Sequence, residues 1–175
     1  MTVNDNVAVA VCVFVAAILQ VTLVASINVA GGTADVLLLA LLAIALFRGA
    51  VAGAVAGFFG GLLIDVMTLD TLGVSALLYA LAGYWAGRYG ETTGRDRGHA
   101  PILAVLVVTI AIAFAGLGLH ALLGEDVSAR RAIFDALLPG LVLNLLLAGP
   151  AWALSRRVLR RPTTSDRVTE VQLLG

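Results

Sequence analysis

Few side chains in this sequence could carry chemistry, and the first pair to consider is a serine with a histidine. Ser75 lies in the segment LGVSA, and His120 lies at the end of a long apolar run. A serine activated by a histidine on a neighbouring membrane helix could act as the nucleophile of an intramembrane protease. The motif expected around such a serine is GxSG, whereas this sequence reads GVSA, and neither residue has a visible dyad context. The chain also shows no phosphate-binding loop and no CxxC or HExxH motif, so we expect no enzyme, metal site or cofactor.

A carboxylate in a glycine-rich apolar stretch is the second candidate. The stretch GFFGGLLIDVMTLDTLG, residues 57–73, holds Asp65 and Asp70. At about 1.5 Å per residue, Asp65 lies about 25 Å along a helix from Arg48, which places it near the opposite membrane boundary. Two interpretations stay open: the aspartates make the following turn polar, or Asp65 binds a partner or ligand inside the membrane.

Two amides stand inside apolar runs. Asn144 lies between Pro139 and Pro150 in LLPGLVLNLLLAGPAW, and Gln20 lies in the first apolar run. Amide side chains often form hydrogen bonds between membrane helices. We prefer this interpretation to a ligand site for both residues.

The composition shows which elements must position these side chains. The chain has 175 residues, of which 61% are hydrophobic and 13% are charged, and its mean hydropathy is +1.03. Soluble domains carry about 25% charged residues. Several apolar runs reach the roughly 20 residues that cross a bilayer. The sequence therefore predicts an all-α, polytopic integral membrane protein, and nothing in its zero net charge indicates a nucleic-acid partner.

Six transmembrane helices account for the apolar runs. An unbroken helix over residues 35–66 would place Arg48 near the membrane centre, which costs at least about 2.5 kcal/mol. Breaking the run at Arg48-Gly49 moves this charge to the membrane boundary. The predicted helices are residues 7–28, 33–47, 49–67, 72–88, 101–123 and 135–155, where the short second helix could start at residue 29. We predict one six-helix domain over residues 1–160 and a cytoplasmic, disordered tail over 161–175.

Arginine sets the predicted orientation, because the chain has no lysine. With the N-terminus inside, only Arg130 and Arg131 lie on the outer side. The other arginines fall on the inner side: Arg48, Arg88, Arg95, Arg97, Arg156, Arg157, Arg160, Arg161 and Arg167. This asymmetry follows the positive-inside rule and predicts cytoplasmic N- and C-termini.

A stripe of glycines marks the third predicted helix. Gly49, Gly53, Gly57 and Gly61 recur every four residues. Gly83 and Gly87 repeat this spacing on the fourth helix. Small residues at such spacing let helix backbones approach closely in lipid. The stripe either packs these helices on each other or on the first helix, or it is reserved for a partner protein.

Several sequence blocks, taken in order, resemble the rod shape-determining protein MreD family. The blocks are AILQVTL, ADVLLLALLAIALFRG, GAVAGFFGGLLID (residues 53–65), LGVSALLYALAGYWAGR and LLPGLVLN (residues 137–144). Together they cover most of residues 16–160. The family pattern retains an acid at the place of Asp65, which favours a functional role for this residue, such as fixing a turn against which a partner docks.

The resemblance implies a non-catalytic scaffold in the bacterial plasma membrane. Family members work with the bitopic protein MreC in the cell-elongation (Rod) complex. They are thought to link MreB filaments to the glycosyltransferase RodA and its class B penicillin-binding protein. The implied fold is similar to the six-helix substrate-binding subunit of energy-coupling-factor vitamin transporters. Such a subunit is the alternative function, although few side chains here could line a polar ligand pocket.

Overall fold

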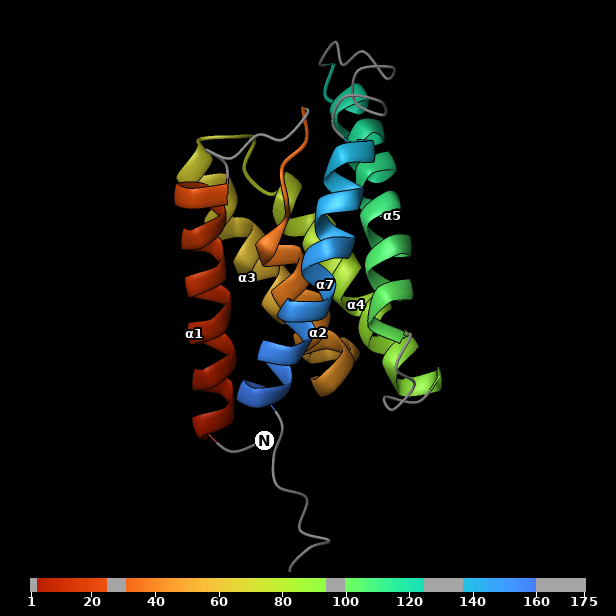
Figure 1. Cartoon of the computed structure of the whole chain (residues 1–175). Coiled ribbons are helices and arrows are strands. Elements are labelled where there is room, and N and C mark those ends of the chain that lie inside the picture. The colour runs from red at the N-terminus through yellow and green to blue at the C-terminus, as the bar shows by residue number, and fades with distance from the viewer. Residues whose placement is uncertain (1–2, 25–30, 94–99, 125–136, 160–175) are drawn as a thin grey trace, which may run out of the picture.

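The structure, a computed structural model, describes residues 3–24, 31–93, 100–124 and 137–159. Within these segments the chain forms six α-helices and no strand, which confirms the predicted all-α class for this part of the protein. The helices are α1 (Val3–Leu19), which continues as the π-helical turn η1 (Gln20–Val24), α2 (Val36–Arg48), α3 (Ala50–Thr68), α4 (Val74–Thr93), α5 (Ala100–Leu122) and α7 (Leu138–Leu159). They run alternately up and down, so α1 starts and α7 ends at the same end of the bundle (Figure 1).

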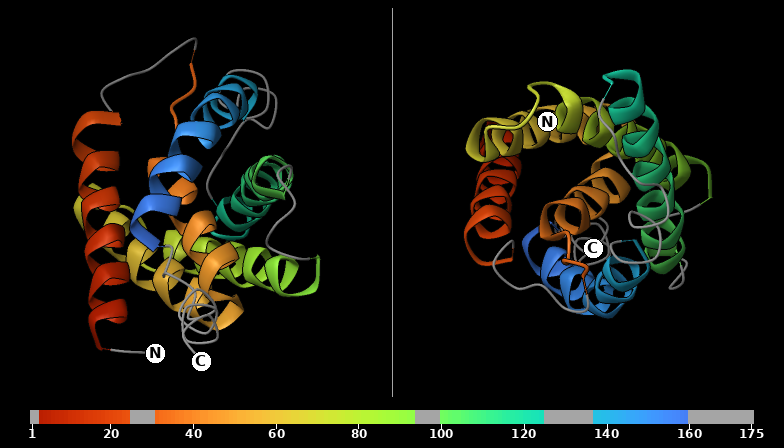
Figure 2. Two further views of the ribbon diagram at one scale, coloured as in Figure 1. Left: turned by 60° about the horizontal axis from the view of Figure 1, so that its bottom comes forward. Right: turned by 90° about the horizontal axis from the view of Figure 1, so that it is seen from above.

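The helix α2 is the centre of the bundle. It contacts α1, α3, α4, α5 and α7, and the view from above shows the other helices around it (Figure 2). Its side chains from Leu37 to Leu39 and from Leu41 to Leu46 are buried. A helix that is apolar on all sides belongs in a protein interior. The hydrophobicity of this segment therefore serves burial among helices rather than contact with lipid.

The segment before α2 is not helical. The chain descends along the bundle through residues 31–35 before α2 begins, and α2 has 13 residues (Figure 1). At 1.5 Å per residue, α2 spans only about 20 Å. The predicted start of this helix near Thr33 is therefore wrong. The extended segment runs along the part of the bundle that α2 does not reach (Figure 1).

The helices α3 and α4 pack backbone against backbone through the glycine stripe. A Cβ atom on Gly53 would overlap the carbonyl of Gly83, and one on Gly57 would overlap the carbonyl of Tyr79. Gly61 lies in the same way on Ser75, and Gly87 lies on Ala50. The residues Gly53, Gly57, Gly61, Gly83 and Gly87 thus all lie in the contact between α3 and α4.

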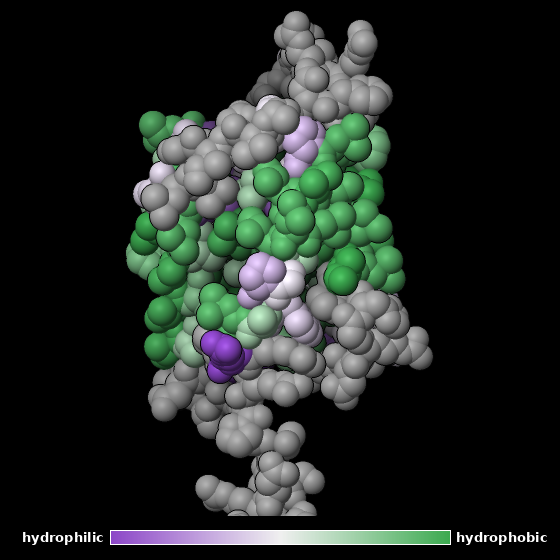
Figure 3. Space-filling model, viewed as in Figure 1, coloured by the Kyte–Doolittle hydropathy of each residue, from purple (hydrophilic) through white to green (hydrophobic). Residues whose placement is uncertain are grey.

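The outer surface of the bundle is apolar. Figure 3 shows hydrophobic residues over most of the viewed face and a hydrophilic group near its lower end. Exposed apolar side chains include Val51, Val107 and Leu146, with 75%, 55% and 70% of their surface accessible. Among the described residues, three segments are long and apolar enough to cross a membrane, namely Ala50–Thr68, Ile102–Leu122 and Leu138–Ser155, whereas Asn6–Thr22 and Val36–Arg48 are apolar but shorter.

The fourth and the last helix end later than predicted, and α7 ends at Leu159 rather than near residue 155. The fourth helix continues beyond Arg88 to Thr93, because Glu91 in its last turn contacts the start of α3. The last helix is described from Leu138, and the predicted start at residue 135 lies outside the described residues, as does the predicted tail, residues 161–175.

Candidate functional site

Polar side chains gather where α2 begins inside the bundle. The extended segment before α2 presents backbone N–H and C=O groups that have no helical partner. Gln20 contacts this segment twice: its Nε2 donates to the carbonyl of Ala34 at 3.0 Å, and its Oε1 accepts from the N–H of Val36 at 2.7 Å. Non-helical backbone at membrane depth is tolerated only where protein groups satisfy it. Gln20 supplies two of these groups.

Asn144 supports the same segment from α7. Its side chain is 2% exposed, and its Oδ1 accepts from the N–H of Asp35 at 2.7 Å. Its Nδ2 donates to the hydroxyl of Thr109 on α5 at 3.4 Å. Asn144 therefore links α7, the start of α2 and α5, which agrees with the interpretation of this residue as a hydrogen-bonding group between elements.

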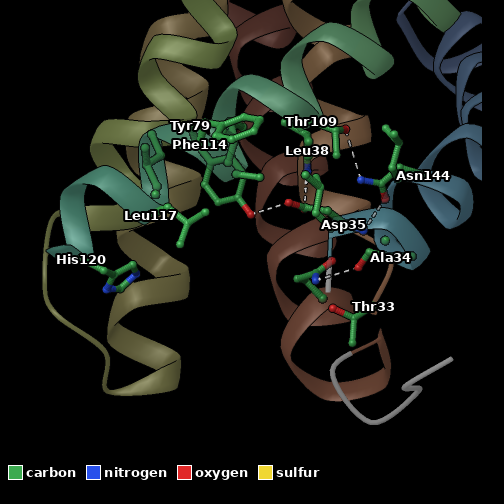
Figure 4. Close-up of a pocket in the computed structure, with 18 residues that line it drawn as sticks. Thr33, Ala34, Asp35, Leu38, Tyr79, Thr109, Phe114, Leu117, His120 and Asn144 are labelled. Carbon is green, nitrogen blue, oxygen red and sulfur yellow. Dashed lines mark hydrogen bonds between the residues drawn. The ribbon is translucent and has the colours of Figure 1, made fainter. Parts of the chain in front are cut away.

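Asp35 caps α2 and also contacts α4. Its Oδ1 accepts from the N–H of Leu38 at 2.8 Å, which is the N-cap interaction. Its Oδ2 accepts from the hydroxyl of Tyr79 at 2.6 Å (Figure 4). A distance of about 2.5–2.7 Å is typical of a hydroxyl bonded to an ionised carboxylate. We refer to Gln20, Asp35, Tyr79, Thr109 and Asn144 as the α2 cluster.

The α2 cluster lines a cavity of about 450 Å³. Its other walls come from α4, α5 and α7 and are mostly apolar, with Leu38, Phe114 and Leu117 among them. Figure 4 shows Asp35 and Asn144 on one side of the cavity and His120 on the other. Cavities of 300–1,000 Å³ with apolar walls and a few convergent polar groups are the usual form of small-molecule sites.

Asp65 lies at the turn between α3 and α4. It is 1% exposed, and its Oδ2 accepts from the N–H groups of Gly73 at 2.8 Å and Ala76 at 3.4 Å. Its Oδ1 accepts from the N–H of Ser75 at 3.2 Å. The N–H groups at a helix start lack partners within the helix, and the helix dipole favours a negative charge there. Asp65 thus satisfies the start of α4 from the last turn of α3.

Glu91 makes the reciprocal contact at the opposite end of this helix pair. Its Oε1 accepts from the N–H of Ala50, the first residue of α3, at 2.9 Å. Its Oε2 lies 3.3 Å from Nη1 of Arg88. Each helix of the α3–α4 pair therefore carries, in its last turns, the carboxylate that satisfies the start of the other.

A second concave surface lies between α1 and α3. This α1–α3 groove has a volume of about 830 Å³ and is lined mainly by apolar side chains. On α3 the lining residues Val51, Val55, Phe59 and Leu63 recur every four residues. They lie two positions from the glycine stripe, which is about 200° around a helix. The helix α3 therefore presents small residues to α4 and large residues to the groove.

Pro139 lies in the first turn of α7, where its missing N–H breaks no helical bond. It packs against Gly32, at which a Cβ atom would lie 2.8 Å from the Cβ of Pro139.

Arg48 and Arg88 lie at the same end of the bundle as the start of α1 (Figure 1). The last turns of α7, with Arg156 and Arg157, also lie there. Arg95, Arg97, Arg160 and Arg161 lie outside the described residues.

Sequence reasoning missed Asp35, Tyr79 and Glu91 as polar contacts. The signal for Asp35 was present, because an aspartate directly before an apolar run is a typical helix N-cap. Tyr79 and Glu91 gave no such signal, since their partners are 44 and 41 residues away in the sequence. The Ser75 N–H donates to Asp65, and His120 lines the cavity.

Comparison with known proteins identifies the family. A family model described as rod shape-determining protein MreD matches residues 2–161, whereas no curated protein and no solved structure matches the chain. The similarity to the substrate-binding subunit of energy-coupling-factor transporters therefore stays a prediction. The match covers every helix of the bundle and confirms the resemblance carried by the five sequence blocks. The chain belongs to the rod shape-determining protein MreD family.

Proposed function

We propose that this protein is a non-catalytic membrane scaffold of the bacterial cell-elongation (Rod) complex. Its family is one of rod shape-determining membrane proteins, and its described helices have an apolar outer surface. In this role it binds MreC directly and helps to link MreB filaments to RodA and its class B penicillin-binding protein. In lipid, the energy for such binding comes from van der Waals packing and hydrogen bonds between helices.

The observation that carries the proposal is the α1–α3 groove. The groove is long and apolar, and Phe14 on α1 and Phe59 on α3 are 52% and 58% exposed. Anchors at every fourth position on α3 match the side-chain spacing of a helix that packs alongside. MreC is bitopic, so it has one transmembrane helix that can pack in the groove. We therefore place the transmembrane helix of MreC in this groove.

Site-specific photo-crosslinking in living cells tests this placement. A photoreactive residue at Val55, which is 51% exposed in the groove, should crosslink to MreC. The matched control is Val107 on α5, which is 55% exposed but lies outside the groove. At least tenfold more MreC product is expected from Val55 than from Val107. Equal yields from both positions, or a product with RodA alone, would contradict the proposed site.

The proposed orientation places both termini in the cytoplasm and gives six crossings of the plasma membrane. Arg48 and Arg88 lie at the end of the bundle where α1 starts, which supports this orientation under the positive-inside rule. A single cysteine at Ser128 should react with an impermeant reagent added outside intact cells. A single cysteine at Ser165 should react only after the membrane is opened. Reaction of both positions from one side would rule out six crossings.

A further inference from the structure

The carboxylate of Asp35 faces a cavity in which the described lining residues include no lysine or arginine. The dipole of α2, whose start Asp35 caps, supplies about half a positive charge at this point. This partial charge is smaller than the full charge of an ionised carboxylate, which therefore has no full counter-charge among the described lining residues. An ionisable group inside a membrane protein normally has a partner that balances its charge. We propose that the cavity binds an amphiphilic amine, with its ammonium group against Asp35.

The geometry leaves room for this contact. Oδ1 of Asp35 accepts a hydrogen bond from Leu38 N–H and Oδ2 accepts one from the Tyr79 hydroxyl, and a carboxylate oxygen can accept two. Asp35 is only partly buried, and it lines the cavity. The Tyr79 and Leu38 contacts hold the carboxylate in place. An ammonium group in the cavity can therefore donate to it without displacing either bond.

The rest of the cavity suits the apolar part of such a ligand. Leu38, Ile112, Leu117 and Leu141 line it, and its volume of about 450 Å³ accommodates a small amine or a lipid headgroup with its first methylene groups. Among the described lining residues, His120 is the one that can carry a positive charge, and it lies on the opposite side of the cavity from Asp35 (Figure 4). This arrangement leaves the space beside Asp35 to the ligand.

The charge of Asp35 is not needed for the helix cap. Asparagine caps helix starts about as well as aspartate. An Asp35→Asn variant keeps an oxygen acceptor for Leu38 N–H but loses the negative charge. Capping and ligand binding can therefore be separated by this substitution.

The test measures binding of hexylammonium and of its neutral isostere 1-hexanol to the full-length protein in detergent by calorimetric titration. Wild-type protein should bind hexylammonium at least tenfold more tightly than hexanol. In Asp35→Asn this preference should disappear. Equal affinities for the two probes in wild type, or an unchanged preference in Asp35→Asn, would overturn the proposal.

A second variant keeps the test valid if Asp35→Asn does not fold. Gly116 lines the cavity, and a Cβ atom there would make an ordinary contact of 3.5 Å with Leu78. Gly116→Leu should fill the cavity and abolish hexylammonium binding. Gly118→Leu is the control on the same helix, since a Cβ atom at Gly118 meets nothing within 4 Å. Binding that survives in Gly116→Leu, or that is lost equally in Gly118→Leu, would refute the assigned cavity.

Nanodiscs distinguish two sources of the amine. If a lipid headgroup is the ligand, phosphatidylethanolamine should be retained in native mass spectra and should weaken hexylammonium binding relative to phosphatidylcholine, which is also zwitterionic but has no N–H group to donate. If a water-soluble amine is the ligand, hexylammonium should bind equally in both lipids. Both results support the cavity as an amine site. The site is independent of the α1–α3 groove, so failure here leaves the MreC proposal untouched.

Discussion

The α3–α4 pair and the surroundings of α2 hold helices together in opposite ways. Between α3 and α4 the contact is made by glycines, which have no side chain, so the two backbones touch. One carboxylate accepts hydrogen bonds from the N–H groups at the start of each helix. Around the start of α2 the contact is made by polar side chains. Gln20 and Asn144 form hydrogen bonds with backbone groups that a helix would otherwise pair. The first solution leaves no space, and the second leaves a cavity of about 450 Å³. One side of the bundle is therefore close-packed, and the other side is open to a ligand.

The largest expected effect breaks the close-packed side. In Gly57→Leu the new side chain would overlap the carbonyl of Tyr79, which is backbone and cannot move aside alone. Overpacking typically costs about 1–3 kcal/mol and more when the backbone must shift. We expect loss of the monodisperse protein peak in size-exclusion chromatography in detergent. Gly149→Leu is the control, because a Cβ atom at Gly149 meets nothing within 4 Å. Equal behaviour of the two variants would show that the α3–α4 contact is looser than described.

On the open side we expect a loss of stability in a protein that still folds. Gln20→Ala leaves the N–H of Val36 and the carbonyl of Ala34 without their side-chain partner. Each unsatisfied buried group costs about 1–3 kcal/mol, so the free energy of unfolding should fall by about 2–6 kcal/mol. Thermal unfolding of the purified protein measures this change. The control is Thr22→Ala on the same turn, an exposed residue whose hydroxyl donates to its own helix at Ile18. A loss no greater than in Thr22→Ala would mean that water replaces Gln20.

The smallest effects compare the two ends of the α3–α4 pair. Asp65→Asn replaces one acceptor oxygen by an NH₂ group that faces backbone N–H donors, and a lost bond to a charged group costs about 1.5–3 kcal/mol. Glu91→Gln keeps an oxygen acceptor for the N–H of Ala50 and loses the surface ion pair with Arg88, so we expect about 0.5 kcal/mol. Melting temperatures of both variants test this order. The reverse order would show that the turn at Asp65 is not the stronger cap.

Asp65→Asn also addresses a partner role for this residue. Co-purification of MreC and the synthase pair should be compared at matched thermal stability, for example with a wild-type sample measured at a higher temperature. If Asp65 acts only on the turn, partner retention should follow stability alone. Selective loss of one partner at equal stability would instead assign a contact with that partner.

Much of the helical framework could be predicted from the sequence, because its signals are local. The break at Arg48-Gly49 separates α2 from α3 in the structure, with Gly49 at φ 93°. The glycines recur at the spacing of one helix face, and a stripe of this kind indicates close packing without identifying the neighbouring helix. The structure identifies it as α4.

The cluster around α2 could not be predicted, because it joins residues that are distant in the sequence. The sequence predicts that Gln20 and Asn144 form hydrogen bonds, but it also predicts a helix where their shared partner, the extended backbone before α2, lies. An apolar run does not show whether it lies in lipid or inside protein. Gln20 at the end of α1 and Asn144 on α7 together fix the residue at which α2 begins. The local sequence of α2 does not contain these distant partners, so it cannot predict that residue.

The late position of Asn144 has a consequence for biosynthesis. The extended segment before α2 is completed by a side chain that is synthesised 109 residues after Asp35. A ribosome that adds about 5–20 residues per second reaches Asn144 about 5–20 s after Asp35. During this interval α2, with 13 residues, is too short to span the bilayer as an independent insertion unit. We infer that α2 reaches its final depth only after α7 has been made. Nascent chains arrested before residue 144 should leave a cysteine at position 33 more reactive than in the finished protein.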